Sequence, residues 1–478
     1  MAAASPFLRD ASGAARWLAG AFAVLGLAAA AGFALVAGEI EALYIGVGLI
    51  FCVAVLIDFR LGALLLVLLL PVSATSLFPR GLMGITGLNP MNLLLAGTLA
   101  AFLLKGRLEH PGHVVPRPLA LFYVVPILVG GVLGCLHVDE IHPGFFDLMV
   151  INFTDWKGYL RDMVVKPLLT VVAAVMVAAA VARAPKPEQY IGALAAGVCA
   201  LALVVFGFVV LSEIRLGMLA SPRARSFFME IGTHANELGR VFVTAYALLL
   251  FAWWETKHAP SRLALFIALG ILSFGILITF SRNAFLGFLL VNALFVVWKF
   301  NMKKLGLALL GLGVAAALAP PSVYRRVTYG FDTGSADAVS AGRIDGIWLP
   351  LLPETLNSPL WGNGLGSIMW SHPIDIGAME FVGHPHNAYL EALLDVGLIG
   401  LALMCLFYWH VWKGFRALGS NMYLTPQMRG FFQGACAALI AFAVAGMTGG
   451  SLRPQPENLV LWMAIGMMYG LLARRPAS

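Results

Sequence analysis

Long apolar runs recur along the whole of this 478-residue sequence. Hydrophobic residues make up 60% of the chain and charged residues only 12%, which is about half the charged fraction of a typical soluble globular protein. A helix of roughly 20 apolar residues crosses a bilayer, because a helix satisfies its own backbone hydrogen bonds where no water is present. The sequence therefore predicts an all-α polytopic membrane protein.

The apolar runs predict about 12 to 14 transmembrane helices. The first run follows Arg9 and Arg16 and looks like a secretory signal, but the many later runs favour a retained first transmembrane helix. An even number of spans places both termini on one side of the membrane. The spans are expected near 15–37, 41–57, 60–76, 90–105, 118–136, 163–183, 188–212, 236–254, 261–280, 283–299, 303–320, 389–412, 430–448 and 457–473.

The distribution of charge predicts which side is cytoplasmic. With both termini on one side, that side carries about 18 of the 31 Lys and Arg residues but only about 5 of the 24 Asp and Glu residues. Basic residues are enriched in cytoplasmic loops, so we expect both termini to be cytoplasmic. The long connections 137–162, 213–235 and 321–388 then lie on the outer face, where we expect the chemistry.

This topology divides the chain into three parts. Residues 1–320 form spans with short outer loops, residues 321–388 form the large outer loop, and residues 389–478 form the last spans. Within the large loop, Arg343–Leu356 is apolar enough to lie on the membrane surface as a short helix broken by prolines. The glycine-rich segment 359–366 is expected to form turns that lead back to the histidines that precede the last spans.

The basic residues of the outer face are mostly arginines, whereas most lysines fall on the cytoplasmic side. Guanidinium groups bind phosphate in a bidentate manner and keep their charge where water is scarce. This bias predicts an anionic ligand on the outer face. The alternative is that these arginines pair with outer Asp and Glu residues or extend toward the lipid headgroups.

Two of the outer arginines stand out by their position. Arg282, in T-F-S-R-N-A, joins two apolar runs with almost no loop, so its charge is held near the hydrocarbon boundary, where ionisable residues are functional candidates. Arg161 follows Lys157 by four residues and shares a helical face with it. Asn236 lies at the start of a later span and follows the arginines of segment 221–225. It either caps the helix of that span or contributes to ligand binding.

A polar turn that contains His384, His386 and Asn387 runs directly into an apolar helix beginning near Ala388. Three interpretations are open. A histidine or the asparagine caps the helix; the histidines bind a metal, although no further ligand has a recognised spacing; or a neutral imidazole acts as a general base toward an attacking hydroxyl. In the last case, arginines would neutralise a departing pyrophosphate without a metal or other cofactor.

Four segments resemble the O-antigen ligase and polymerase superfamily of multispanning glycosyltransferases. Their order, their spacing and their position in and around the largest outer loop agree with that family, and the region 281–400 that they span is about a quarter of the chain. They are S-R at Ser281-Arg282, G-R-x-x-x-x-W at Gly342 to Trp348, P-L-W-G-N-G-L-G at Pro359 to Gly366, and H-N-A-Y-L-E-A-L-L-D-V-G-L-I-G from His386.

The resemblance implies a GT-C type of fold and an enzyme of the bacterial inner membrane whose active site faces the periplasm. Such an enzyme takes a glycan from undecaprenyl pyrophosphate without using a metal. In the ligase branch the acceptor is a sugar hydroxyl of lipid A-core, and the product is mature lipopolysaccharide. The expected partners are this donor, this acceptor and membrane lipids, with no nucleic acid.

The resemblance also implies roles for particular residues. His386 stands at the family's essential histidine position, and Arg282 is the first candidate to hold the pyrophosphate. Two departures are Asp395, where Glu is usual, and the additional His384, which is available to share the work. The resemblance and the charge argument together give further candidates for binding the donor or supporting the site. They are Arg161, Lys166, Arg223, Arg225, Arg343, Asn387 and Asn236.

Other functions remain open at this point. Outer arginines followed ten residues later by glycine, a pattern associated with the polymerase branch, are absent, which favours a ligase. A polymerase or a protein O-oligosaccharyltransferase would use the same donor. A transporter of an anionic lipid would also explain the arginines, but transporters usually carry ionisable residues at mid-membrane depth, and most of the expected spans lack them.

Overall fold

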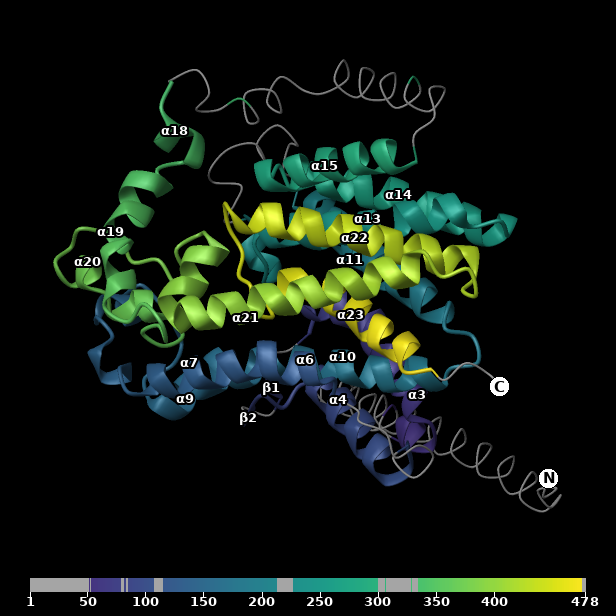
Figure 1. The fold of residues 1–478 in the computed structure, drawn as a ribbon, viewed down its shortest axis with the longest axis horizontal. Helices are drawn as coiled ribbons and strands as arrows, with labels where there is room; N and C mark the ends of the chain where they lie inside the picture. Colours follow the sequence, from purple (N-terminus) through teal and green to yellow (C-terminus); the bar gives the residue numbers. More distant parts are fainter. Residues whose placement is uncertain are drawn as a thin grey trace.

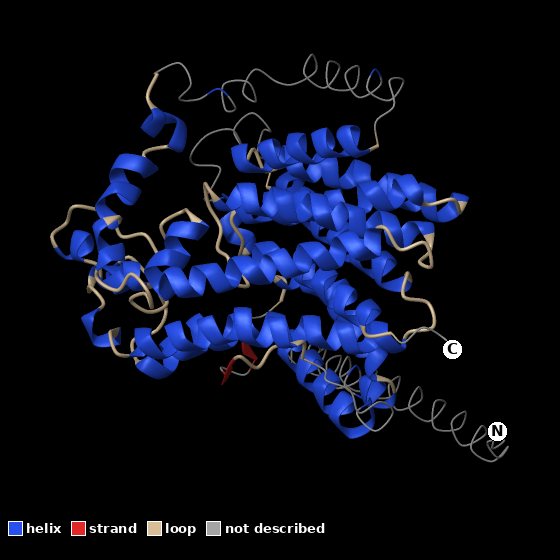
Figure 2. Ribbon diagram, viewed as in Figure 1, coloured by secondary structure: helices blue, strands red, loops and turns tan. Residues whose placement is uncertain are grey.

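The computed structural model describes residues 51, 53–78, 81–82, 85–106, 115–212, 227–299, 306, 328 and 334–474. Helices dominate this part of the chain, and two short strands, β1 (Gly81–Leu82) and β2 (Ile85–Thr86), pair in antiparallel fashion (Figure 2). Seven of the described helices are long and apolar enough to cross a membrane. The prediction of an all-α polytopic membrane protein is confirmed.

The seven long apolar helices coincide with expected spans. They are Arg117–Cys135 (containing α6, Arg117–Leu119, and α7, Val125–Cys135), Trp156–Arg183 (containing α9, Trp156–Leu160, and α10, Lys166–Arg183), Gln189–Leu211 (α11), Ala235–Glu255 (α13), Ala259–Ile278 (α14), Ala388–Gly419 (α21) and Pro426–Gly446 (α22). The runs expected near 15–37, 41–57 and 303–320 lie wholly or mostly outside the described residues.

Four shorter apolar helices also match expected spans: Phe59–Ser73 (α3), Pro90–Ala101 (α4), Arg282–Trp298 (α15) and Leu459–Leu472 (α23). The connections contain short helices at Val138–Glu140, Gly144–Asp147 (α8), Phe228–Ile231, Ala336–Ser340 (α18), Leu349–Leu351 (α19), Pro353–Leu356, Ser367–Trp370, His372–Asp375 (α20) and Pro456–Asn458. In Figure 1 the long helices run across the view, and α18, α19 and α20 gather at the left end of the bundle.

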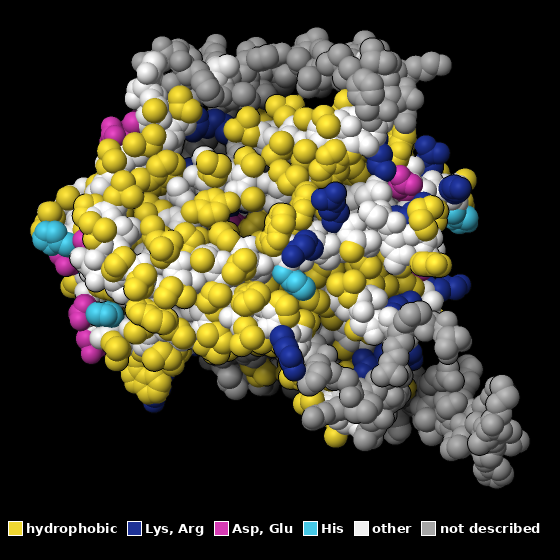
Figure 3. All heavy atoms as spheres, viewed as in Figure 1, with side chains coloured by type: hydrophobic (Ala, Val, Ile, Leu, Met, Phe, Trp, Pro, Cys, Tyr) yellow, Lys and Arg dark blue, Asp and Glu magenta, His cyan; other side chains and the backbone are white. Residues whose placement is uncertain are grey.

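The types of side chain at the surface change along the length of the bundle. Hydrophobic side chains cover most of the face in Figure 3, as expected for helices that contact lipid. Most of the visible Lys and Arg side chains lie toward the right-hand end, whereas most of the visible Asp and Glu side chains lie at the left margin, near α19 and α20. On this face the two ends of the bundle therefore differ in charge.

Three helices contain a wider, π-helical turn two residues before a proline. The turns are Ala120–Val124, Arg161–Val165 and Ile344–Trp348, and the prolines are Pro126, Pro167 and Pro350. A proline ring clashes with the carbonyl four residues earlier, and a π turn displaces that carbonyl without ending the helix. In the large loop this keeps 344–356 almost continuously helical. The short helix expected there is confirmed, but the break expected at Pro350 is wrong, because the π turn before it accommodates the proline ring.

Glycines allow two pairs of helices to pack closely. A Cβ on Gly434 of α22 would lie 2.4 Å from the carbonyl oxygen of Ala247 in α13. A Cβ on Gly466 of α23 would lie 2.4 Å from the carbonyl oxygen of Ala174 in α10. Close backbone approach at small residues is the usual way in which membrane helices associate, because lipid provides no hydrophobic driving force between them.

The long helix α21 is interrupted at Gly397, where φ is +67°. At this break the backbone N–H of Leu398 donates to the carbonyl of Pro359 (2.9 Å), and that of Ile399 donates to the carbonyl of Leu360 (3.2 Å). Segment 359–366 therefore packs against the helix backbone itself. Its glycines adopt positive φ angles, as expected for a segment of turns.

Candidate functional site

The polar turn with the two histidines lies at the N-terminus of α21. Asn387 is the N-cap: its Oδ1 accepts hydrogen bonds from the backbone N–H groups of Tyr389 (3.0 Å) and Leu390 (3.1 Å). The capping interpretation is therefore confirmed for Asn387. Within the described part of the chain, no side chain is hydrogen-bonded to the imidazole of His386.

His384 supports the conformation of His386. The Nδ1 atom of His384 accepts a hydrogen bond from the backbone N–H of His386 (3.2 Å), and the two ring centroids are 4.1 Å apart. His386 has a φ of +53°, a left-handed conformation that costs a non-glycine residue roughly 1–3 kcal/mol and persists only where the surroundings enforce it. We therefore interpret His384 as a residue that positions His386.

The surroundings of His386 keep its ring neutral. Burial is the largest cause that lowers the pKa of His386, and together with the neighbouring His384, Arg343, Arg240 and His234 it brings this pKa to about 3. Burial likewise lowers the pKa of His384. A neutral imidazole has one nitrogen lone pair available to accept a proton, which is the form that a general base requires.

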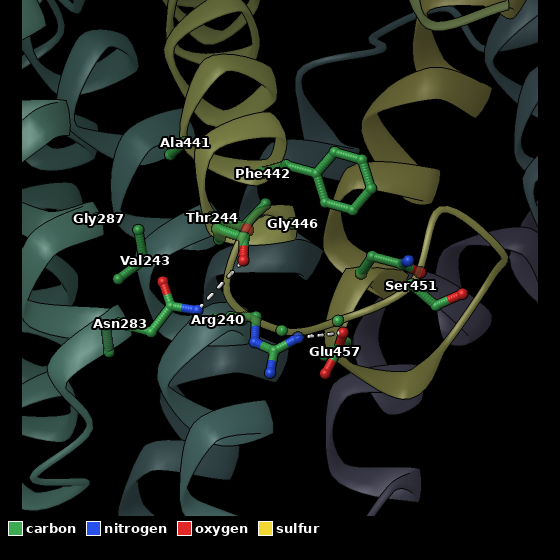
Figure 4. Close-up of a pocket in the computed structure, with 15 residues that line it drawn as sticks. Arg240, Val243, Thr244, Asn283, Gly287, Ala441, Phe442, Gly446, Ser451 and Glu457 are labelled. Atoms are coloured by element: carbon green, nitrogen blue, oxygen red, sulfur yellow. Dashed lines mark hydrogen bonds and ion pairs between the residues drawn. The ribbon is translucent and has the colours of Figure 1, made fainter. Parts of the chain in front are cut away.

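A pocket opens between α13, α15, α22 and the segment that follows α22 (Figure 4). It holds about 460 Å³ of empty volume, part of which is open to the outside. Small or apolar side chains, such as Val243, Ala441 and Phe442, form the walls between the helices. The polar side chains at the pocket are Arg240, Thr244, Asn283, Ser451, Glu457 and Asn458.

The C-terminal end of α22 connects this pocket to the histidine turn. A Cβ placed on Gly446, which lines the pocket, would lie 3.4 Å from the Cβ of Ala388, the first residue of α21. Arg343 reaches the same place, since its guanidinium donates a hydrogen bond to the carbonyl oxygen of Thr448. His386 and Arg343 therefore lie near the pocket although neither lines it.

Arg282 is at the same end of the bundle. It is the first residue of α15, and the next residue, Asn283, lines the pocket and donates to the carbonyl of Ala445 (3.4 Å). The N-cap of α15 is Ser281, whose Oγ donates to Oδ1 of Asn236 (2.8 Å). The structure thus brings the positions of Arg282, Asn236 and His386 around one pocket.

Of the two roles expected for Asn236, helix capping is wrong. The N-cap of α13 is His234, whose Nδ1 accepts from the backbone N–H of Asn236 (3.1 Å). Glu237 completes this cap by accepting a hydrogen bond from the backbone N–H of His234 (3.3 Å). The side chain of Asn236 is thereby left to bind Ser281 and to connect α13 with α15.

Arg161 and Lys166 are held by a carboxylate of their own. The Arg161 Nε atom lies 2.7 Å and the Lys166 Nζ atom 2.9 Å from Oδ1 of Asp162, and neither basic residue lines the pocket. This is the pairing that the alternative interpretation of the outer basic residues expected. Arg223 and Arg225 lie outside the described residues.

A buried ion-pair network fixes the first turns of α21. Nη2 of Arg453 lies 2.5 Å from Oε1 of Glu391 and 3.6 Å from Oδ2 of Asp395, and all three residues are buried. The other carboxylate oxygen of Asp395 accepts hydrogen bonds from the backbone N–H groups of Gly366 (2.9 Å) and Ser367 (3.2 Å). Asp395 therefore joins the P-L-W-G-N-G-L-G segment to the helix that follows His386.

Sequence reasoning did not single out Arg240, Glu391, Arg453 or Glu457. Arg240 and Glu391 lie inside expected spans, where an ionisable residue is a functional candidate, so a signal was present for these two. Arg453 lies in the short connection between the last two expected spans, and Glu457 is the first residue of the last one, so neither lies inside a span and neither carries a comparable signal. Their importance follows from their contacts with Glu391 and Arg240.

We find no site suited to a metal among the residues that the structure describes, since no three His, Cys, Asp or Glu side chains there lie close enough together to hold an ion. The polar groups that line the pocket are instead a guanidinium, amides, hydroxyls and the carboxylate of Glu457, which is paired with Arg240, and the imidazole of His386 lies nearby. This set is suited to binding an anion and to transferring a proton.

Comparison with known proteins matches this chain to a family and to a relative. Residues 265–405 match the family described as O-antigen ligase, and this region runs from α14 into α21 and contains the four motif segments. A protein of Rickettsia bellii (strain RML369-C), provisionally named a polysaccharide ligase, is 24% identical over 216 residues, which cover 42% of this chain and 51% of that protein. The match thus spans about half the length of that relative.

Proposed function

We propose that this chain, in which residues 265–405 match the O-antigen ligase family, transfers O-antigen polysaccharide from undecaprenyl pyrophosphate to a sugar hydroxyl of lipid A-core. The family match and the polysaccharide ligase relative support an enzyme that joins glycans. In this proposal the protein is a GT-C type glycosyltransferase of the bacterial inner membrane, its termini are cytoplasmic, and its active site faces the periplasm.

One observation carries the proposal: a neutral histidine lies beside a pocket that Arg240 lines and that Arg343 and the start of α15, at Arg282, approach. The pKa of His386 is lowered by burial and by the positive charges of Arg343 and Arg240. Arg282 is the first residue of α15, and Asn283, which follows it, lines this pocket. The arrangement provides a base and several cations at one end of the helices, which glycosyl transfer from a diphosphate requires.

In the reaction that we propose, His386 takes the proton of the acceptor hydroxyl as its oxygen forms a bond to the anomeric carbon of the donor. The bond from that carbon to the diphosphate breaks, and the arginines stabilise the departing charge without a metal. The negative diphosphate also offsets the positive charges that lower the pKa of His386. The bound donor therefore makes the imidazole a stronger base than it is in the empty enzyme.

Reconstitution in detergent tests the proposal. Purified protein is mixed with an undecaprenyl pyrophosphate-linked glycan and three competing acceptors: rough lipopolysaccharide, a second lipid-linked glycan and a protein. We expect the glycan to join rough lipopolysaccharide. Transfer to the second glycan would instead indicate a polymerase, and transfer to the protein an O-oligosaccharyltransferase.

The same experiment separates an enzyme from a transporter of anionic lipid. Detergent micelles enclose no compartment, so glycan joining in micelles cannot result from transport. A protein that joins glycan to none of the acceptors, yet moves the lipid-linked glycan across the membrane of sealed vesicles, would contradict the proposed activity.

A further inference from the structure

Arg240 lies on the second turn of α13 and is directed toward the pocket (Figure 4). Its side chain is 15% exposed, and its Nη1 atom forms an ion pair with Oε1 of Glu457. The Nε atom of Arg240 is buried and has no hydrogen-bond partner among the described residues. The guanidinium therefore has binding capacity that Glu457 does not use.

Two consecutive glycines lie beside this guanidinium. A Cβ on Gly450 would lie 2.4 Å from Nη1 of Arg240, and a Cβ on Gly449 would lie 3.2 Å from Nη2. Any other residue at position 450 would displace the guanidinium or the chain, and Gly450 also has a φ of +76°. The segment after α22 thus passes close to the guanidinium of Arg240, and at these two glycine positions it places no side chain over that group.

Arg240 is close enough to the proposed base to affect it. Its positive charge contributes to the lowered pKa values of both His384 and His386. The guanidinium of Arg343 binds the carbonyl of Thr448, the residue before Gly449. Arg240 and Arg343 therefore approach the same short segment, at the pocket that lies beside the histidine turn.

Glu457 is in an unfavourable place for a carboxylate. It is 8% exposed, and its charged neighbours are Arg240 and Glu237 of α13 and Glu391 of α21. Burial is the largest cause that raises the pKa of Glu457, Arg240 opposes the rise and the two other carboxylates add to it, and the resulting pKa is about 7. A second anion placed on Arg240 would repel the Glu457 carboxylate in a site with little water.

We propose that the guanidinium of Arg240 binds a phosphate group of the anionic substrate and that the carboxylate of Glu457 is the internal anion that this phosphate displaces. This inference rests on the proposed function and adds to it a residue outside the four motif segments. Because two anions cannot share Arg240 without strong repulsion, Glu457 takes up a proton when the diphosphate binds. A purely structural ion pair would bind no proton in that step.

The first measurement is the affinity for farnesyl diphosphate, a short polyprenyl diphosphate, at pH 6 and pH 8. The full-length protein in detergent is compared with the Glu457→Gln variant, which carries a neutral side chain at both pH values. We expect equal affinities at pH 6 and about tenfold weaker binding by the unsubstituted protein at pH 8. The ionisation of the ligand itself cancels in this comparison.

The second measurement removes both charges. Arg240→Met alone would leave Glu457 buried without a cation, so the double variant Arg240→Met/Glu457→Gln is used, since it leaves no unpaired charge in the fold. We expect this variant to bind farnesyl diphosphate at least tenfold more weakly than Glu457→Gln at both pH values. Glu255 and Lys299 form an ion pair of 2.6 Å at the other end of α13. The control variant Glu255→Gln/Lys299→Met should bind like the unsubstituted protein.

Several results would overturn the inference. They are undetectable binding by the unsubstituted protein, the same pH dependence in Glu457→Gln as in the unsubstituted protein, or undiminished binding by the double variant. These outcomes are distinct from failure of the proposed function. A protein that binds the diphosphate as expected but joins no glycan to rough lipopolysaccharide would contradict the ligase activity and leave the role of Arg240 intact.

Discussion

The indole Nε1 of Trp348 donates a hydrogen bond of 2.8 Å to the carbonyl oxygen of Pro385, the residue directly before His386. Trp348 ends the G-R-x-x-x-x-W segment, and Arg343 near the start of that segment binds the carbonyl of Thr448 at the end of α22. One helical turn thus contacts both the histidine turn and the edge of the pocket. This geometry gives a physical reason for the spacing between the arginine and the tryptophan.

Replacing Trp348 tests whether this hydrogen bond positions the histidine. Trp348→Phe keeps an aromatic ring but loses a hydrogen bond worth about 1 kcal/mol. We expect the kcat of glycan transfer to fall several-fold while the KM for the donor changes little, because the base is displaced and the arginines are not. Trp361→Phe is the control, since Trp361 lies in the same loop and is 58% exposed. Equal effects of the two substitutions would contradict the positioning role.

The two histidines should differ in their response to substitution. His386→Ala removes the proposed base, and we expect transfer to rough lipopolysaccharide to fall by a factor of about 10² or more. His384→Ala removes only the acceptor for the backbone N–H of His386, so a smaller loss is expected, and His384→Asn should restore part of it. Transfer assays on detergent-purified variants whose Tm is unchanged measure which substitution causes the larger loss of activity. The reverse order would assign the base to His384.

The stability of the protein should depend on pH through His386. The pKa of this residue is about 3 in the folded protein and near its ordinary value of 6.5 when unfolded, so the unfolded state binds more protons between these values. The stabilising contribution of the neutral ring is therefore complete above pH 6.5 and lost as pH falls toward 3, by no more than about 1.4 kcal/mol per pH unit.

The variant His386→Gln lacks this titration. Its Tm, measured by thermal unfolding in detergent, should decline less than that of the unsubstituted protein between pH 7 and pH 4. Parallel declines in the two proteins would show that His386 is not held neutral by the fold.

The close approach of α10 and α23 should make Gly466 sensitive to a single added carbon. A Cβ there would lie 2.4 Å from the carbonyl oxygen of Ala174, so Gly466→Ala is expected to cost about 1–3 kcal/mol and to lower the Tm. Gly270→Ala in α14 is the control, because no atom lies within 4 Å of the added Cβ. An unchanged Tm for Gly466→Ala would mean that the two helices are farther apart.

Replacing Arg453, the cation of the buried network, should lower the stability of the protein more than replacing Asp395, one of its two carboxylates. Arg453→Met leaves Glu391 and Asp395 buried without a cation, and such a loss typically costs about 3–5 kcal/mol. Asp395→Asn keeps an oxygen that accepts hydrogen bonds from Gly366 and Ser367, so a milder effect is expected. The purification yield and the Tm in detergent measure the stability of each variant. A larger effect of Asp395→Asn would identify the hydrogen bonds, not the ion pair, as the main support.

Local signals in the sequence predicted much of the fold. The apolar runs predicted the seven long and four shorter apolar helices described above within a few residues. The two exceptions are Trp156–Arg183, which starts earlier than expected, and Ala388–Gly419, which ends later. Hydrophobic runs are decisive because the bilayer imposes a minimum length and requires internal hydrogen bonds. Asn387 was recognised as a possible cap for a similar reason, since capping involves neighbours within three residues.

The sequence alone determined that this is a helical membrane protein, and its ordered motifs indicated the family and the histidine at the N-terminus of α21. Only the tertiary structure decided which charges meet. It paired Arg240 with Glu457, which are 217 residues apart, and Arg453 with Glu391, which are 62 apart. Arg161 and Lys166 are instead bound by Asp162, which lies on the same helical turn. The physical reason is that a span is specified by residues next to one another in the chain, whereas an ion pair at a helix end depends on how separate helices pack.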